Sequence, residues 1–172
     1  MNGRVEARAR AVVLAWAAFV IGITYAAISV YWAVGGTWLL STVGVGLARA
    51  DASGQVALVV AVWFAVVVKG VAAVLPVVAV QASRESLVRK GARVLTWAEA
   101  AILSAYGLVL TVVGVLVQLN VIGVPPSADH LALRWHAYLW DPRFLVWGIV
   151  IGAAMIVSRI GSKAHRAGFP DR

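Results

Sequence analysis

One charged side chain, Lys69, lies inside a long apolar stretch, residues 55–80. A charged group at the centre of a bilayer costs about 2.5–3.5 kcal/mol on insertion scales, so such residues are usually paired, deprotonated or functional. Three interpretations stay open. The flexible stem of Lys69 carries its ammonium group to the cytoplasmic headgroups; or polar groups of the next apolar stretch hold it, namely Tyr106, Ser104 or Glu99; or it binds an anionic ligand or relays a proton.

A second polar group gathers shortly before the last apolar stretch: His130, Arg134, His136 and Asp141. A zinc site needs three or four convergent ligands, and two histidines with one aspartate at these spacings match no zinc pattern. The sequence therefore predicts no metal site. We expect Arg134 and His136 to contact lipid phosphates, or His136 and Asp141 to bond to each other and fix the loop.

Several chemistries lack their residues. The chain has no cysteine, which excludes thiol chemistry, and no GxSxG, HExxH or Walker motif. Glu99 is expected in the first turn of a helix that starts at Trp97, where the helix dipole favours a carboxylate. That placement leaves no acidic residue in the middle of a helix, as small proton-coupled exporters require. No cofactor and no enzymatic reaction are indicated.

The elements that position these residues are four long apolar stretches. The chain has 172 residues, of which 62% are hydrophobic and only 13% charged, whereas a soluble domain is about half apolar. A helix of about 20 residues crosses the hydrocarbon core, and only helices or closed barrels satisfy the backbone there. We predict an all-α, four-helix transmembrane bundle over residues 11–160, with basic tails at 1–10 and 161–172. Its helices are expected at about 11–34, 55–80, 97–121 and 142–160.

The charge pattern predicts the orientation of the bundle. The net charge is +8, which in a soluble protein would suggest nucleic acid; here most of the 15 Lys and Arg residues lie in the two tails and the second loop. Lys and Arg accumulate in cytoplasmic loops. We therefore expect both termini in the cytoplasm, the first and third loops outside, and no nucleic-acid partner.

The third loop, about 122–141, is long for a connection. After Pro125-Pro126-Ser127, the spacing of Leu131, Trp135 and Tyr138 gives a helix one apolar, aromatic face. That pattern is typical of a helix lying in the membrane interface, so we predict a short interfacial helix in this outer loop.

Small residues recur at helical spacing on three of the stretches: Ala18, Gly22 and Ala26; Ser104, Gly107, Thr111 and Gly114; Gly148 and Gly152. Such residues let helices approach closely in lipid. They serve either to pack this one bundle or, at Gly148 and Gly152, to form the seam of a homodimer.

Three segments carry a resemblance: residues 31–38 (YWAVGGTW), 134–136 (RWH) and 139–144 (LWDPRF). Together with the four helices and the basic tails, they resemble a bacterial family of small four-helix membrane proteins classed as a domain of unknown function, over about residues 12–158. The resemblance implies this fold and the bacterial cytoplasmic membrane, and it transfers no catalytic residue. Family members often have an aromatic residue after the Asp-Pro pair, where this chain has Arg143.

The family segments fall at the outer end, where Tyr31, Trp32 and Trp38 could meet the interfacial helix. They form either a packed cap or a shallow pocket for a lipid or another amphiphile, with Arg134 and His136 near its polar head. The leading hypothesis is a non-enzymatic membrane protein, structural or accessory, that binds membrane lipids or an unidentified membrane protein. The alternatives are a small transporter or channel component that uses Lys69, and an enzyme acting on a lipid at the outer leaflet through His136 and Asp141.

Overall fold

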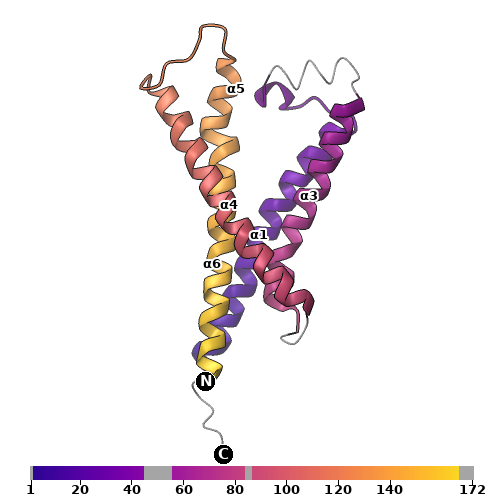
Figure 1. Ribbon diagram of the computed structural model, residues 1–172, viewed down its shortest axis with the longest axis vertical. Coiled ribbons are helices and arrows are strands. Elements are labelled where there is room, and N and C mark those ends of the chain that lie inside the picture. Colours follow the sequence, from indigo (N-terminus) through magenta and orange to yellow (C-terminus); the bar gives the residue numbers. More distant parts are fainter. Residues whose placement is uncertain (1, 45–55, 84–86, 167–172) are drawn as a thin grey trace, which may run out of the picture.

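The computed structural model describes residues 2–44, 56–83 and 87–166, and throughout these ranges the only regular structure is helical (Figure 1). The long helices are α1 (Asn2–Ala33), α3 (Val56–Gln81), α4 (Leu87–Gln118) and α6 (Asp141–Arg166). The short elements are the 3-10 helix η1 (Leu40–Thr42), the helix α5 (His130–Trp135) and the π-helix η2 (His136–Trp140). The predicted all-α fold is confirmed.

Four helical runs are long and apolar enough to cross a membrane, by length and composition: Val5–Ala33, Val59–Gln81, Leu87–Gln118 and His130–Ile160. Their outward faces carry large apolar side chains; Phe64 is 69% exposed and Val109 is 58% exposed. A water-soluble monomer rarely leaves apolar surface of this extent uncovered. The four helices expected from the sequence are therefore present.

The start of the third long helix differs from the expected one in a way that affects the site. The third long helix starts at Leu87, not at Trp97, because polar residues continue a helix as readily as apolar ones once its backbone bonds are formed. Glu99 therefore lies in the interior of α4. The predicted short helix exists as α5, but it continues through η2 into α6 without a break, so the fourth long helical run begins at His130.

Helical structure extends further into the two predicted tails than expected, and α3 contains a proline. Residues of the predicted N-terminal tail are helical from Asn2 onward, and α6 continues to Arg166; residues 167–172 lie outside the described ranges. Helix α3 does not end near Pro76 but passes it and continues to Gln81. Neighbouring helices and local adjustments make proline tolerable inside apolar helices of this kind.

The first and last long helices, α1 and α6, pack against each other. α1 packs on α3 and on α6, while α4 packs on α6 and on α3. Figure 1 shows the α1–α3 pair and the α4–α6 pair crossing and then diverging toward η1 and α5. We call that end, with η1 and residues 119–129, the loop end. The opposite end, where α1 begins and α6 finishes, is the terminal end.

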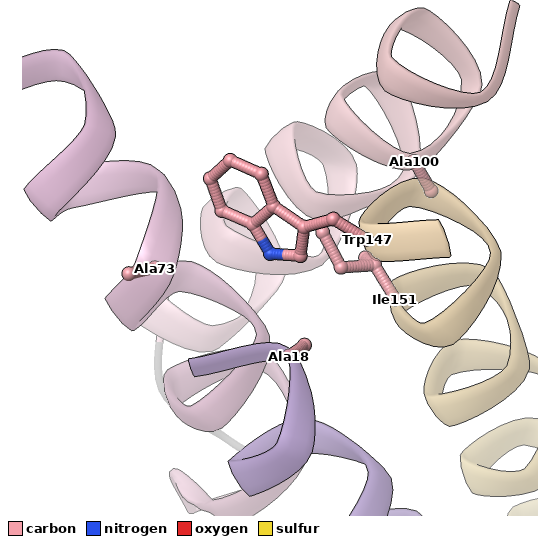
Figure 2. Packing of buried hydrophobic residues seen from close by; sticks show 5 residues of the cluster. All are labelled: Ala18, Ala73, Ala100, Trp147 and Ile151. Atoms are coloured by element: carbon pink, nitrogen blue, oxygen red, sulfur yellow. The ribbon is translucent and has the colours of Figure 1, made fainter. Parts of the chain in front are cut away.

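The core is built around one large ring. Trp147 of α6 is 2% exposed and packs with Ile151 and with three alanines, Ala18, Ala73 and Ala100. Figure 2 shows the indole pointing away from α6 toward Ala18 of α1 and Ala73 of α3, with Ala100 contributed by α4. The small side chains of Ala18 and Ala73 leave room for the indole, and all four long helices contribute a residue to this cluster.

The small-residue faces pack this bundle, as the first of the two interpretations proposed. A Cβ on Gly22 would collide with the Trp147 ring, one on Gly107 with the backbone of Leu145, and one on Gly114 with Ala137. Gly148 packs in the same way against Ser104 of α4, whereas Gly152 has open space around it. The homodimer seam through Gly148 and Gly152 stays a prediction.

Candidate functional site

Tyr25 is the centre of a polar and aromatic cluster inside the bundle. The side chain belongs to α1, is 3% exposed, and donates its hydroxyl proton to the backbone oxygen of Trp140 at 2.7 Å. Its ring stacks on Phe144 with centroids 4.9 Å apart. A buried tyrosine needs a partner for its hydroxyl, and the contact between α1 and the start of α6 supplies one.

Two cations converge on the Tyr25 ring from different helices. Lys69 Nζ of α3 lies 5.7 Å from the ring centroid, and Arg143 Cζ of α6 lies 4.6 Å from it. Cations are attracted to the face of an aromatic ring at these separations. In the described part of the chain, the ion pairs are Arg10–Glu6 and His136–Asp141, so neither Lys69 nor Arg143 is paired with a carboxylate there.

Lys69 is oriented by a hydroxyl of the first helix. Its ammonium group donates a hydrogen bond to Ser29 Oγ at 2.7 Å, and Ser29 in turn donates its proton to the backbone oxygen of Tyr25 at 3.1 Å. The hydroxyl is thereby left with a lone pair for Lys69. The hydrogen-bond partner of Lys69 is thus Ser29 of α1 and not Tyr106, Ser104 or Glu99, the groups that one of the three interpretations considered. The ammonium group also extends toward the loop end, because Ser29 lies one turn before α1 finishes at Ala33.

His136 and Asp141 bond to each other, as one of the sequence interpretations predicted. His136 Nδ1 lies 3.1 Å from Asp141 Oδ1, with the carboxylate side chain only 7% exposed and the imidazole 38% exposed. The backbone N–H of Asp141 also donates to the carbonyl of His136 across η2. A π-turn brings residues five apart into register, and the pair fixes the junction between α5 and α6.

The aromatic residues at the loop end are joined by hydrogen bonds into a cap. Trp32 Nε1 donates to the backbone oxygen of Trp38 at 2.9 Å, and the backbone N–H of Trp38 donates to Tyr31 Oη at 3.3 Å. Trp140 Nε1 donates to Thr42 Oγ1 at 3.1 Å. The turn needs Gly35, whose φ of +90° suits a residue without a side chain. The cap ties α1 and η1 to the start of α6.

The structure joins some of the predicted site residues and separates others. Lys69 lies beside Tyr25. Asp141 directly follows Trp140, whose backbone oxygen accepts the hydrogen bond from the Tyr25 hydroxyl. Arg134 is exposed on α5 and makes no hydrogen bond or ion pair with the described residues. Across the same ranges, no three His, Asp or Glu side chains gather as metal ligands.

Tyr25, Ser29 and Arg143 were missed by the sequence interpretation. A signal existed for the first two, since a phenol and a hydroxyl four residues apart in an apolar helix share one face and both need partners. The signal for Arg143 was weaker: it is a cation in the first turn of an otherwise apolar helix.

Four apolar helices with a cationic and aromatic cluster toward one end define a class of small helical proteins compatible with a membrane. The chain belongs to the family described as Protein of unknown function (DUF3995), whose model matches residues 22–151. The matched range includes Tyr25, Lys69 and Arg143, and it confirms the resemblance drawn from the sequence. No curated protein and no solved structure matches the chain significantly.

Proposed function

We propose that this chain is a multi-pass protein of the bacterial cytoplasmic membrane that binds an anionic amphiphile, a phospholipid headgroup above all, at the Tyr25 cluster. It acts as a lipid-binding, accessory protein rather than as an enzyme. Both termini lie in the cytoplasm, and the loop end faces outward. The concentration of Lys and Arg in the tails and second loop supports this orientation.

The observation that carries the proposal is the pair of cations against Tyr25. Lys69 and Arg143 lie within helical runs apolar enough to span a membrane, and no described carboxylate neutralises them. Both side chains are half-buried, and a cation inside an apolar span is costly unless its charge is compensated, so an anion from outside the chain would stabilise the folded protein. Asp141 is the one carboxylate near the cluster, and it is already engaged by His136.

The chemistry of the two cations suits a phosphate diester. A guanidinium group binds phosphate through two parallel N–H donors, and a lysine ammonium group adds a point charge. Anionic lipids can approach the Tyr25 cluster by diffusing in the plane of the membrane. Tyr31 and Trp38, which are 43% and 66% exposed, are aromatic side chains of the kind that lie in the headgroup layer.

The lipid-binding prediction is tested by native mass spectrometry of the protein purified in mild detergent. We expect wild-type protein to retain phosphatidylglycerol in preference to phosphatidylethanolamine. Lys69→Met and Arg143→Met should each weaken that binding at least about tenfold, because a hydrogen bond to a charged group contributes about 1.5–3 kcal/mol. Lys90→Met, which removes an exposed cation at the other end of the bundle, is the matched control and should bind as wild type does.

Equal retention of both lipids by the wild type, or equal losses in all three variants, would refute the proposal. Thermal unfolding of each variant separates lost binding from lost folding. A bare protein that co-purifies with stoichiometric copies of another membrane protein would favour a partner-binding role instead.

The alternative functions have less support. His136 is bonded to Asp141 and to no hydroxyl of the described residues, so it activates no nucleophile there. A transporter role for Lys69 has no comparable observation in its favour, because the ammonium group is already held by Ser29 Oγ.

The orientation is tested by cysteine labelling, for which the chain is suited because it has no native cysteine. Ser127→Cys and Ser83→Cys place thiols at two exposed positions at opposite ends of the bundle. An impermeant maleimide added to intact cells is expected to label the first variant and spare the second, and lysis should make both reactive. Labelling of Ser83→Cys in intact cells would reverse the orientation.

A further inference from the structure

Among the described residues, helix α4 carries most of the buried side-chain nitrogen and oxygen atoms that lack a hydrogen-bond partner. They are Thr96 Oγ1, Trp97 Nε1, both carboxyl oxygens of Glu99, and Thr111 Oγ1; α6 adds Trp147 Nε1. Buried polar groups are normally hydrogen-bonded, so each exception calls for an explanation. Among these residues Glu99 alone can ionise, and it therefore has the largest energetic consequence.

The position of Glu99 excludes the usual explanation for a carboxylate in a helix. α4 begins at Leu87, so Glu99 lies three turns inside it, whereas the helix dipole acts mainly within the first turn. The side chain borders the buried stripe of α4, which includes Thr96, Ala100 and Gly107. Both of its oxygens are shielded, within a helix apolar enough to span a membrane.

Among the described side chains of the neighbouring elements, no charged group is paired with Glu99. On α4 itself, Arg93 donates to Ser158 Oγ at 3.2 Å. On α6, Arg159 Cζ stacks 4.5 Å from the Trp97 ring centroid. On α3, Lys69 is bound to Ser29, and residues 70–81 of that helix carry no charge.

Further titratable groups on α4 and on the elements that pack on it lie toward its far end. Tyr106 follows Glu99 by about two turns on α4 itself, and Asp141 and Arg143 stand at the start of α6. His130 and Arg134 belong to α5 and His136 to η2, and both elements contact α4 at the loop end. Glu99 makes no ion pair with any of these groups.

From this geometry we propose that Glu99 is a reversible proton-binding site inside the bundle, occupied as a neutral carboxylic acid in the resting protein. An ionised carboxylate shielded from water and without donors is strongly disfavoured, and binding a proton removes the charge. Ionisable residues within membrane spans commonly relay protons. Glu99 thereby supplies the mid-helix acid that the sequence analysis considered absent, and the inference does not rest on lipid binding at Tyr25.

The direct test is modification by dicyclohexylcarbodiimide, an apolar reagent that reacts with protonated carboxyl groups in apolar surroundings. The acid adds across one C=N bond: its proton goes to a nitrogen and its oxygen to the central carbon. The adduct then rearranges to a stable N-acylurea, with no leaving group and no change of oxidation state. We expect one adduct per folded chain, mapped to Glu99 by peptide mass spectrometry, forming more slowly as the pH rises.

Two variants make this test specific. Glu99→Gln should lose the adduct and still fold, because the amide has the shape and neutrality of the acid. Glu6→Gln removes an exposed carboxylate that pairs with Arg10 and should keep the adduct. A folded protein whose Glu99 stays unmodified would overturn the proposal, as would protection of Glu99 by sodium at fixed pH, which would make the site one for a metal cation.

Thermal unfolding in detergent gives an independent readout. If the folded state holds the proton and the unfolded state releases it, the stability must fall as the pH rises. We expect this slope in wild-type protein and its disappearance in Glu99→Gln. An unchanged slope, together with a lower unfolding temperature for Glu99→Gln, would mean that Glu99 is ionised and paired.

Discussion

Replacing Trp147 with alanine is expected to lower the free energy of unfolding by about 3–5 kcal/mol, the usual range for removing a large buried aromatic ring. Trp147 belongs to the cluster to which all four long helices contribute, and Ala18 and Ala73, on the side of its ring, are too small to close the cavity. Helix association in lipid depends on van der Waals packing, so the lost contacts have no substitute. Thermal unfolding in detergent measures the effect.

Two control variants test whether the loss of stability comes from the buried ring of Trp147. Trp147→Phe keeps most of the contact area and removes the indole N–H, which has no partner, so it should cost less than about 1.5 kcal/mol. Trp63→Ala removes an indole that is 43% exposed on the surface of α3 and should change stability far less. Similar losses in Trp147→Ala and Trp63→Ala would contradict the central role of the Trp147 ring.

Substituting Gly107 and Gly91 of the same helix with alanine is expected to give opposite results. The new Cβ at Gly107 would collide with the backbone nitrogen and Cα of Leu145, and a backbone cannot rotate aside as a side chain does. Separating α4 from α6 should cost about 1–3 kcal/mol. Gly91 is exposed and has nothing within 4 Å of a Cβ, so alanine there should stabilise the helix by up to about 1 kcal/mol.

The comparison of these glycines is made by equilibrium unfolding of both variants in the same mixed micelles. A stabilising Gly107→Ala would show that α4 and α6 are not in close contact at Leu145. A destabilising Gly91→Ala would show that an unseen contact covers that face of α4.

The helices could be predicted from the sequence because apolar length alone defines them. Their boundaries could not, since a helix is maintained by backbone hydrogen bonds and continues through polar residues. The first turns of α4 contain Arg89, Lys90 and Arg93, and reading them as a loop moved Glu99 to a helix start. The misplacement hid the most unusual carboxyl group in the chain.

Contacts in the site between residues close in sequence could be predicted, and contacts between distant residues could not. The His136–Asp141 bond joins residues five apart and could be predicted from their spacing alone. The sequence offers Lys69 similar hydroxyl groups on two helices, Ser29 on the first and Ser104 on the third. Because α1 and α4 both pack on α3, only the three-dimensional arrangement of the helices decides that Ser29 is the partner.

The direct contact of α1 with α6 has a consequence for biosynthesis. The ribosome releases α1 first and α6 last, yet Tyr25 depends on Trp140 for its hydroxyl partner, and the pocket formed by Ala18 and Ala73 is filled by Trp147. α6 also packs on α3 and α4. A nascent chain without α6 therefore contains three long helices but lacks Trp147, the large side chain of their shared core. Assembly is completed by the last segment to be translated, and a shortened chain is left open to the proteases that clear incomplete membrane proteins.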